Sequence, residues 1–360
     1  MIIGIDGNEA NVAQRVGVSV YTFNLLKEFH KKADKNLQFV TYIKSTPLAD
    51  LPKAKDHFRY QVIRASLWSQ IFLPLELYKN RKIDIFFTPA HYAPRFCPVP
   101  YVVTIHDLSY FYYPDEFLKK DLYKLKSWTK YSVVRAKKVI AVSKQTKNDL
   151  IKFYNTSENR IEVIYNGYEK KMTQSVILSE VEGSTYILYV GTLQPRKNIT
   201  TLIRAFAEFK KYHLQFRLVI TGKKGWLYDE IFKQAKNLRL GKDIIFTDYV
   251  SDEELIWLYK NAFCFVLPSL YEGFGLPLLE AMSYDCPVVS SNSSSLPEIG
   301  GNACLYFDPK NEKELLEKLG LLISDERLRN ELIEKGRERI KLFSWQKCAN
   351  ETLEVIKSAL

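Results

Sequence analysis

The feature that most constrains the fold is a repeated alternation of short apolar runs with amphipathic segments. The short runs favour buried strands, and several of the segments between them place apolar residues at helical spacing. Strands that alternate with helices form a parallel sheet covered by helices on both faces. The first series of expected strands is Ile2–Ile5, Gln38–Ile43, Tyr60–Ile63, Ile83–Thr88, Tyr101–Ile105, Val139–Val142 and Ile161–Tyr165.

A second series of the same kind follows a stretch without clear periodicity. Asn166 and Gly167 signal a turn, and residues 171–185 are predicted to be a linker. The expected strands are Tyr186–Val190, Arg217–Thr221, Ile244–Thr247, Phe263–Leu267, Val288–Ser291 and Ala303–Tyr306. The expected helices are Asn198–Tyr212, capped by Asn198, then Asp229–Leu238, Asp252–Lys260, Pro277–Tyr284 and Glu312–Ile323.

The chain of 360 residues is long enough for two domains. We predict an α/β protein with two doubly wound, Rossmann-like domains, residues 1–170 and 186–343, that face each other across a cleft. Ligands bind at the carboxyl ends of the strands in this architecture. Ser344 is expected to cap a final amphipathic helix that runs to residue 360.

The positive charge of the chain is concentrated in its first half. Residues 1–180 hold 28 lysines and arginines against 17 acidic residues, whereas residues 181–360 hold 24 of each. Lysines alternate with aromatic residues from Tyr110 to Lys138, which suits an interfacial surface. The first half could therefore contact an anionic membrane surface, nucleic acid or an acidic substrate, or it could be a solubilising surface only.

No apolar run is long enough to span a membrane, and the N-terminus shows no basic leader. We therefore expect a cytoplasmic protein, with the inner face of the membrane as a second, peripheral location. The five cysteines lie far apart without a CxxC pair, which favours reduced thiols over disulfides or a metal site.

The stretch PSLYEGFGLPLLE, Pro268 to Glu280, has the most specific pattern. Gly273 and Gly275 allow a tight turn and a close approach of the backbone to a ligand. Pro277 is suited to the first position of a helix, whose free N–H groups attract phosphate. The carboxylates of Glu272 and Glu280 suit hydroxyl groups, as on a sugar and a ribose. The alternative is a tight turn with one solvated glutamate and one glutamate in the first turn of the helix, where the helix dipole favours it.

The loop GTLQPRKNI, which begins at Gly191, follows the first strand of the second series. Thr192 can form a hydrogen bond, and Arg196 and Lys197 beside a helix N-terminus suit a diphosphate. The alternative is two solvated charges. Both this loop and the Glu272 loop are expected at the same edge of the sheet.

Three further positions follow expected strands. His106, in the sequence IHDL, is a candidate for contact with a ligand, although a lone histidine is more often structural. Ser143 could contact a ligand, but a helix cap is the better interpretation. The turn at Tyr249 and Val250 could hold a flat base. Gly17 precedes an expected helix and could lie near a phosphate, while the histidines at 30, 57, 91 and 213 lack comparable settings.

The run EGFGLPLLEAM, with glutamates at 272 and 280, resembles glycosyltransferase family 4, the group 1 glycosyltransferases. Other similar segments occur in the expected order along nearly the whole chain. These are VTIHDL (103–108), VIAVSKQTKNDL (139–150), VIYNGY (163–168), YVGTLQPRKNI (189–199), YVSDEEL (249–255), PVVSSNSSSLPEIGGNACLYFDP (287–309) and FSW (343–345).

The resemblance implies the GT-B fold, with the final helix crossing back onto the first domain. It implies a retaining, metal-independent transfer of a hexose from a nucleotide-diphosphate sugar, which is a co-substrate, so no cofactor is expected. The acceptor would be a glycan or a lipid-linked saccharide. We expect mannose from a guanosine diphosphate donor, with glucose and N-acetylglucosamine as other options.

The same resemblance implies roles for individual residues. Glu280 would hold the ribose and Glu272 would face the donor sugar, and Arg196 and Lys197 would bind the diphosphate. The backbone from Phe274 to Leu276 would approach the sugar and phosphate. His106 would reach the donor sugar, and Gly17 would lie on the opposite wall in the acceptor domain.

Two other classes of protein fit parts of the sequence. A nucleotide-sugar epimerase or hydrolase of the same fold would turn over the donor without an acceptor. A basic nucleic-acid-binding protein would explain the charge of the first half, but the most specific motif lies in the neutral half. A nicotinamide-dependent dehydrogenase is disfavoured because the GxGxxG fingerprint is absent from the opening strand–helix unit.

Overall fold

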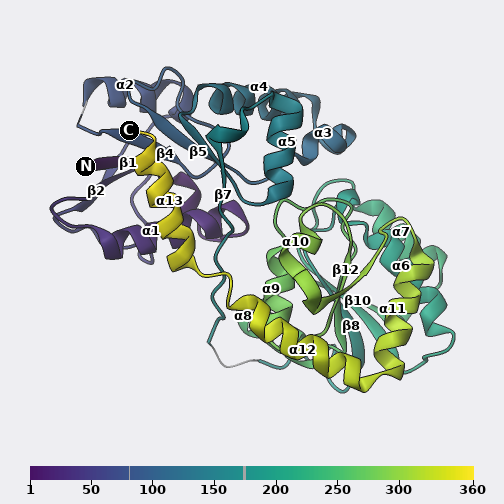
Figure 1. Ribbon diagram of the computed structural model, residues 1–360. Helices are drawn as coiled ribbons and strands as arrows, with labels where there is room; N and C mark the ends of the chain where they lie inside the picture. Colours follow the sequence, from purple (N-terminus) through teal and green to yellow (C-terminus); the bar gives the residue numbers. More distant parts are fainter. Residues whose placement is uncertain (81, 173–175) are drawn as a thin grey trace. The chain divides into compact units, whose positions relative to one another are not determined.

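The computed structural model describes residues 1–80, 82–172 and 176–360. The chain divides into two compact units (Figure 1). The first unit holds Met1–Gly167 and Phe343–Leu360, and the second holds Tyr168–Leu342.

The first unit is built on a sheet of seven parallel strands in the order β3-β2-β1-β4-β5-β6-β7. The strands are β1 (Ile2–Asp6), β2 (Gln38–Ile43), β3 (Phe58–Val62), β4 (Ile85–Thr88), β5 (Tyr101–Ile105), β6 (Lys138–Ala141) and β7 (Ile161–Val163). The helices are α1 (Val18–Lys32), α2 (Leu73–Lys79), α3 (Ser109–Tyr112), α4 (Lys119–Arg135), α5 (Lys144–Tyr154) and α13 (Trp345–Ser358), and a π-helical segment, Trp68–Phe72, leads into α2.

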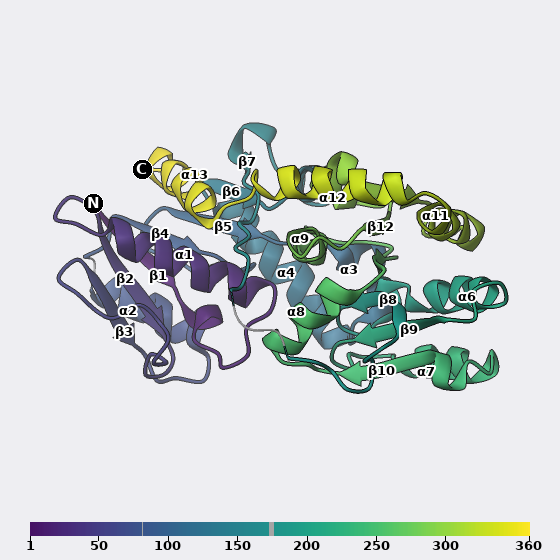
Figure 2. The same cartoon turned by 90° about the horizontal axis from the view of Figure 1, so that it is seen from below.

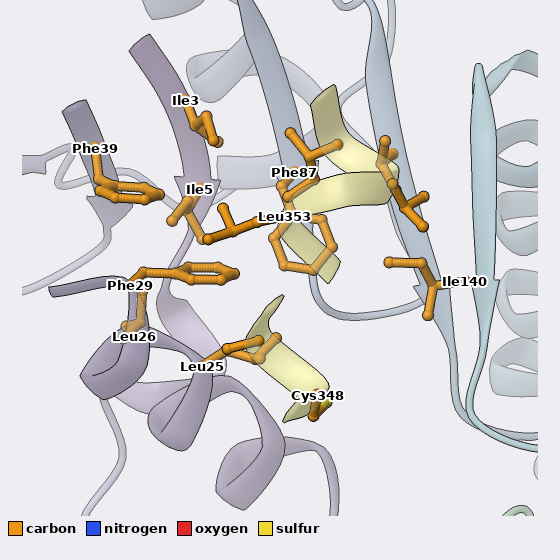
Figure 3. Close-up of a cluster of buried hydrophobic side chains, with 14 of the residues drawn as sticks. Ile3, Ile5, Leu25, Leu26, Phe29, Phe39, Phe87, Ile140, Cys348 and Leu353 are labelled. Atoms are coloured by element: carbon orange, nitrogen blue, oxygen red, sulfur yellow. The ribbon is translucent and has the colours of Figure 1, made fainter. Parts of the chain in front are cut away.

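Two hydrophobic cores cover the two faces of this sheet, because successive strand residues point to opposite faces. Phe87 packs with α1 and α13 on one face, whereas its neighbour Phe86 packs with α2, α4 and α5 on the other. Figure 3 shows the first of these cores, with Leu353 and Cys348 of α13 beside Phe29 and Leu25 of α1.

The last helix therefore completes the core of the unit that begins the chain, as predicted. Figures 1 and 2 both show α13 alongside α1. Its N-cap is Ser344, whose side chain accepts a hydrogen bond from the backbone N–H of Lys347 at 3.1 Å. Gly167 lies against the start of this helix, since a Cβ there would be 2.3 Å from the backbone nitrogen of Trp345.

The second unit is built on a sheet of six parallel strands in the order β10-β9-β8-β11-β12-β13. The strands are β8 (Thr185–Val190), β9 (Phe216–Thr221), β10 (Ile244–Asp248), β11 (Cys264–Leu267), β12 (Val288–Ser291) and β13 (Cys304–Phe307). The helices are α6 (Ile199–Lys210), α7 (Asp229–Asn237), α8 (Asp252–Asn261), α9 (Leu276–Ser283), α10 (Leu296–Gly300), α11 (Glu312–Ser324) and α12 (Glu326–Ile340).

In the second unit the sequence prediction lacks one long helix, α12, and places some element ends differently. Helix α12 is rich in charged residues, and only Leu332 and Gly336 are buried, so its apolar periodicity is weak. The predicted linker, residues 171–185, falls in the second unit, apart from residues 173–175, which lie outside the described residues. Within the described residues, no helix has both the length and the apolar character needed to cross a membrane.

Candidate functional site

The strand order of the second sheet brings two loops together at its carboxyl edge. The order reverses between β8 and β11, and ligands of doubly wound sheets bind at such a switch point. The loop after β8 carries Arg196 and Lys197, and the loop after β11 carries Glu272. The two loops are joined by a hydrogen bond of 2.9 Å from the Leu270 N–H to the Arg196 carbonyl.

Glu272 forms a charged cluster with the two cations. Its Oε1 accepts hydrogen bonds from Lys197 Nζ at 2.6 Å and from Ser269 Oγ at 2.7 Å. The guanidinium of Arg196 lies 3.9 Å from Oε2 and donates to the Tyr271 carbonyl at 3.3 Å. The exposed fractions of the Glu272 and Arg196 side chains are each 12% and that of Lys197 is 17%, so the cluster is largely withdrawn from water.

The charges in this cluster decide the ionisation of Glu272. Burial opposes ionisation, but the positive charges of Lys197 and Arg196 and the hydrogen bonds from Lys197 and Ser269 outweigh it. The pKa of Glu272 is therefore held below its usual value. Two cations and one carboxylate leave a net positive charge at the sheet edge, which suits an anionic ligand such as a diphosphate.

Serine residues after β12 fix the loop that carries Glu272. Ser294 Oγ accepts from the Glu272 N–H at 2.8 Å. Ser295 Oγ donates to the carbonyls of Glu272 at 2.9 Å and Phe274 at 3.0 Å. The sequence reasoning assigned no role to these serines. The run of serines directly after an expected strand was the signal that could have identified them.

The glycine-rich turn ends in helix α9, which starts one residue earlier than predicted. Gly275 is the N-cap with a φ of 105°, and a Cβ there would lie 2.7 Å from Leu296 Cδ2, so glycine is required. Leu276 is the first helical residue and Pro277 the second. Gly273 and Phe274 are buried in the turn.

Glu280 lies on α9 in a different environment from Glu272. Its Oε2 accepts a hydrogen bond from the Tyr259 hydroxyl at 2.9 Å. Burial raises the pKa of Glu280, and the bond from Tyr259 and the charge of Lys171 only partly oppose this. The two glutamates of the motif therefore differ, because Glu272 is held ionised by cations and Glu280 is shifted toward its protonated form.

Asn198 does not cap α6 with its side chain, contrary to the prediction. It occupies the N-cap position with a φ of 56°, and its side-chain amide donates to the carbonyls of Pro268 at 3.0 Å and Pro309 at 2.7 Å. Tertiary contacts therefore take the place of the local cap. The effect is to tie the start of α6 to the loop after β11.

The remaining donor-site candidates of the second unit also follow strands of its sheet. Gly191 and Thr192 come directly after β8, and both are half-buried. Tyr249 and Val250 come directly after β10; Tyr249 is 52% exposed, and Lys223 lies over its ring at 4.7 Å from the centroid. All four positions therefore belong to the same carboxyl edge as Glu272.

His106 follows β5 at the carboxyl edge of the first sheet, as predicted. Its Nε2 lies 2.7 Å from the Pro89 carbonyl, and because a carbonyl only accepts, Nε2 carries the proton. Burial, with a smaller effect of His91, lowers the pKa of His106 to about 4. The ring is therefore neutral near pH 7, with its lone pair on Nδ1.

The structure adds two titratable residues to this edge. His91, which the sequence reasoning set aside, lies with its ring centroid 5.8 Å from that of His106, and burial lowers its pKa. Its Nδ1 is buried without a hydrogen-bond partner. Asp6 ends β1, and burial raises its pKa to about 7. The strand order of the first sheet also reverses at β1 and β4, which is the signal that identifies both residues.

Ser143 and Gly17 both begin helices of the first unit. Ser143 is fully buried and its Oγ accepts from the Thr146 N–H at 3.1 Å, which confirms the interpretation as a cap. Gly17 is exposed at the start of α1 with a φ of 51°, and a Cβ built there would meet no atom within 4 Å. The space beside Gly17 is therefore open to a ligand. The Ser143 hydroxyl, in contrast, is engaged in the helix cap.

Potential metal ligands are not clustered in the described part of the chain. Over residues 1–80, 82–172 and 176–360, no three His, Cys, Asp or Glu side chains are arranged as a metal site would need. All five cysteines are free thiols, and four of them are buried.

Family models and a characterised relative match this chain. The model "Glycosyltransferase Family 4" matches residues 16–171, and the model "Glycosyl transferases group 1" matches residues 171–339. The chain is 32% identical over 288 residues to the O-antigen chain mannosyltransferase B of Escherichia coli, covering 78% of this chain and 75% of that protein.

Solved structures share the fold over nearly the whole chain. Sucrose-phosphate synthase from Thermosynechococcus elongatus superposes with a TM-score of 0.78 at 20% identity, covering 99% of this chain and 98% of the other. HepE of Anabaena, solved in complex with UDP and glucose, gives a TM-score of 0.73 at 18% identity and covers 99% of each chain. These likenesses and the two parallel sheets confirm the predicted two-domain GT-B fold.

Proposed function

Because the chain belongs to glycosyltransferase family 4, the group 1 glycosyltransferases, we propose that it transfers mannose from a nucleotide-diphosphate sugar to a hydroxyl of a glycan or lipid-linked saccharide. The O-antigen mannosyltransferase relative supports mannose, and the complex of HepE with UDP supports a nucleotide donor. The family assignment itself covers glycosyl transfer, and the sugar and acceptor are the proposed part.

The cluster of Arg196, Lys197 and Glu272 is the observation that carries this proposal. Cleavage of the bond between sugar and phosphate leaves negative charge on the diphosphate. Fixed cations and the N–H groups at the start of α9 would stabilise that charge as it develops. Glu272 would hold Lys197 in place through the 2.6 Å contact and present its other oxygen to the sugar.

We assign retention of the anomeric configuration to the reaction as part of the same proposal. The acceptor hydroxyl would attack the sugar from the face that the diphosphate leaves, and the leaving phosphate would take the proton of that hydroxyl. The C–O bond to the diphosphate breaks and a C–O bond to the acceptor forms, so atoms and charge balance without a covalent enzyme intermediate. In this scheme the charge of the leaving group is stabilised by side chains and a helix N-terminus, and the reaction proceeds without a metal ion.

Hydroxyl recognition is the role that we propose for Glu280 and His106. Glu280 would bind the ribose, with Tyr259 fixing its carboxyl group. A neutral His106 with its lone pair on Nδ1 would accept a hydrogen bond from a sugar hydroxyl, because a pKa of about 4 makes it a poor proton donor near pH 7. The positive charge of residues 1–180 supports a location at the inner face of an anionic membrane.

A donor panel is the direct test of the proposal. Purified protein is incubated with nucleotide-diphosphate sugars, with and without a saccharide acceptor, and the free nucleotide diphosphate and the configuration of the product are measured. We expect turnover that requires acceptor, fastest with a mannose donor, and a product of retained configuration. Turnover of donor alone would indicate the epimerase or hydrolase alternative instead, and an inverted product would exclude the mechanism.

Two variants test the residues. Glu272→Ala and Lys197→Ala are each expected to abolish transfer, since the first removes a sugar contact and the second a phosphate contact. Circular dichroism checks that each variant remains folded. Transfer at the wild-type rate by both folded variants would contradict the assigned site.

A further inference from the structure

The segment that leads into and forms α2 exposes an apolar stripe. Leu67, Ile71, Leu75 and Tyr78 recur at spacings of four, four and three residues, which places them on one side of a helix. Their exposed fractions are 56%, 42%, 59% and 46%, and that of the adjacent Phe72 is 42%.

This stripe is not the face that holds the segment onto the protein. Trp68, Leu73 and Leu77 of the same segment are at most 2% exposed and belong to the hydrophobic core beneath it. The segment therefore has one apolar side packed in the core and a second apolar side in water. Contiguous exposed apolar side chains of this kind mark an interaction surface.

Neighbouring elements extend the apolar surface on the same face of the sheet. Helix α4 and the loop before β5 pack into the same hydrophobic core as α2, so all three cover the same face of the sheet. Their outer sides therefore point away from the sheet. Figure 1 shows α2 and α4 along the upper border of the first unit. Phe96 in this loop is 66% exposed, and its N–H donates to the Tyr131 hydroxyl of α4 at 2.8 Å. Leu118 and Tyr123, at the start of α4, are 76% and 68% exposed.

Positive charges surround these apolar side chains. Helix α4 has Lys119, Lys120 and Lys130 exposed, and Asp121 is its one acidic residue. Lys79 and Lys82 are exposed at the end of α2. The acidic residue of α2, Glu76, accepts a hydrogen bond from the Asn80 side chain.

We propose that this surface, formed by residues 67–79, Phe96 and the outer side of α4, docks the enzyme on an anionic lipid bilayer. The apolar side chains would enter the interface between headgroups and acyl chains, and the lysines would contact lipid phosphates. A bilayer of anionic lipid fits both properties, because each lysine near its surface gains from the negative surface potential. The proposal rests on the membrane location given under the proposed function and adds the surface that would make the contact. Lipid binding itself needs neither donor nor acceptor.

Vesicle sedimentation tests the docking surface without sugar transfer. The full chain is incubated with vesicles of phosphatidylcholine alone or of phosphatidylcholine with phosphatidylglycerol, at low and high salt. We expect binding to the anionic vesicles that weakens with salt. Leu75→Glu should lower the partition coefficient at least tenfold, since it removes a leucine that would enter the lipid interface. The double variant Lys119→Glu and Lys120→Glu should lower the partition coefficient about fivefold for each cation lost.

A matched control distinguishes binding through this surface from nonspecific binding by any exposed apolar side chain. Leu214 of the second unit is 74% exposed, and Leu214→Glu is expected to leave the partition coefficient unchanged. Circular dichroism and transfer to a soluble acceptor check that each variant is intact. Because vesicle binding is measured without substrates, its failure would leave the proposed sugar transfer standing.

Three outcomes would overturn the docking proposal. The first is equal binding to both kinds of vesicle, or binding to neither. The second is an equal effect of Leu75→Glu and Leu214→Glu. The third is a wild-type protein that does not bind vesicles but forms a dimer, measured by light scattering, which Leu75→Glu dissociates. The stripe would then be a contact between two copies of the chain.

Discussion

The carboxyl edges of the two parallel sheets share a topology but differ in electrostatics. At the edge of the second sheet, Glu272 is held ionised by Lys197 and Arg196. At the edge of the first, His106 and Asp6 are shifted by burial, with pKa values of about 4 and about 7. Burial acts on both edges, but only the second has opposite charges close enough to outweigh it.

The difference indicates a division of labour between edges of the same architecture. An edge with two fixed cations and one carboxylate suits the phosphates of a donor, because the cluster keeps a net positive charge that a diphosphate can neutralise. An edge with largely neutral polar groups suits hydroxyls, which both donate and accept hydrogen bonds without a net charge. Variants at Lys197, Asp6, His106 and Ser295 test how far this contrast holds.

The ion pair at the charged edge should give the largest effect. Lys197→Met leaves the carboxylate of Glu272 in a largely buried site with the more distant Arg196 and the Ser269 hydroxyl, so the free energy of unfolding should fall by about 3–5 kcal/mol. The double variant with Glu272→Gln should recover a large part of that loss, because the side chain that has lost Lys197 is then neutral. Urea unfolding of the single and double variants measures both values.

A surface pair provides the reference for this experiment. Lys341 and Glu338 are 65% and 73% exposed, and breaking their contact should cost less than about 1 kcal/mol. Equal losses of unfolding free energy at the two pairs would contradict the view that burial makes the Lys197–Glu272 pair more important for stability than a surface pair.

Asp6 should make the opposite contribution at the neutral edge. Its pKa is raised from 3.8 to about 7, so between these values the folded state keeps a proton that the unfolded state has lost. Stability from this group is therefore lost as the pH rises through that window. Asp6→Asn should be more stable than the wild type by up to about 4 kcal/mol at about pH 8, and by far less at about pH 4.

Urea unfolding at the two pH values measures the Asp6 effect. A neutral asparagine can still accept the hydrogen bonds from Asn8 that Asp6 accepts. A variant that is less stable than the wild type at the higher pH would show that Asp6 is ionised and paired, and the contrast between the edges would fail.

His106 should show the reverse pH dependence. Its pKa is lowered from 6.5 to about 4, so the unfolded state gains a proton in this window before the folded state does. Stability should fall by about 3 kcal/mol as the pH drops from about 6.5 to about 4. His106→Gln retains a donor for the Pro89 carbonyl and should remove this pH dependence. Proton NMR titration of the histidine ring gives an independent value, and a pKa near 6.5 would refute the neutral ring.

Ser295 should give the smallest effect of the four. Ser295→Ala removes the donor to the carbonyls of Glu272 and Phe274, and a buried carbonyl without a partner should cost about 1–3 kcal/mol in unfolding free energy. Ser324→Ala, on the exposed end of α11, should change it by less than about 0.5 kcal/mol. If the two variants are alike in unfolding, the serine run does not fix the Glu272 loop.

The strands were the part of the fold that could be predicted best. Each expected strand is present, and Gln38–Ile43, Tyr101–Ile105 and Val288–Ser291 have the predicted ends. Strands buried on both faces need continuous apolar runs, which are visible in the sequence without knowledge of their partners. Helix α12 was missed because two buried positions in fifteen residues give almost no periodic signal.

The site residues also divide into those that the sequence predicts and those that it does not. Arg196, Lys197 and Glu272 could be proposed from charges placed in glycine- and proline-marked loops after strands. His91, Asp6 and the serines after β12 could not, because their importance comes from neighbours distant in sequence. Asn198 shows the same limit, since its side-chain NH2 donates to the distant carbonyls of Pro268 and Pro309 and its Oδ1 accepts from the Thr201 hydroxyl in place of a backbone N–H.

Periodicity and short motifs are local properties, so the two α/β units, the loops that carry the charges and the family of the chain could be predicted from the residues alone. The ionisation of each group and the second apolar stripe of α2 are visible only in the folded chain. Ionisation depends on burial and on charges contributed by other loops, and the stripe is apparent only once the other face of its segment is seen in the core.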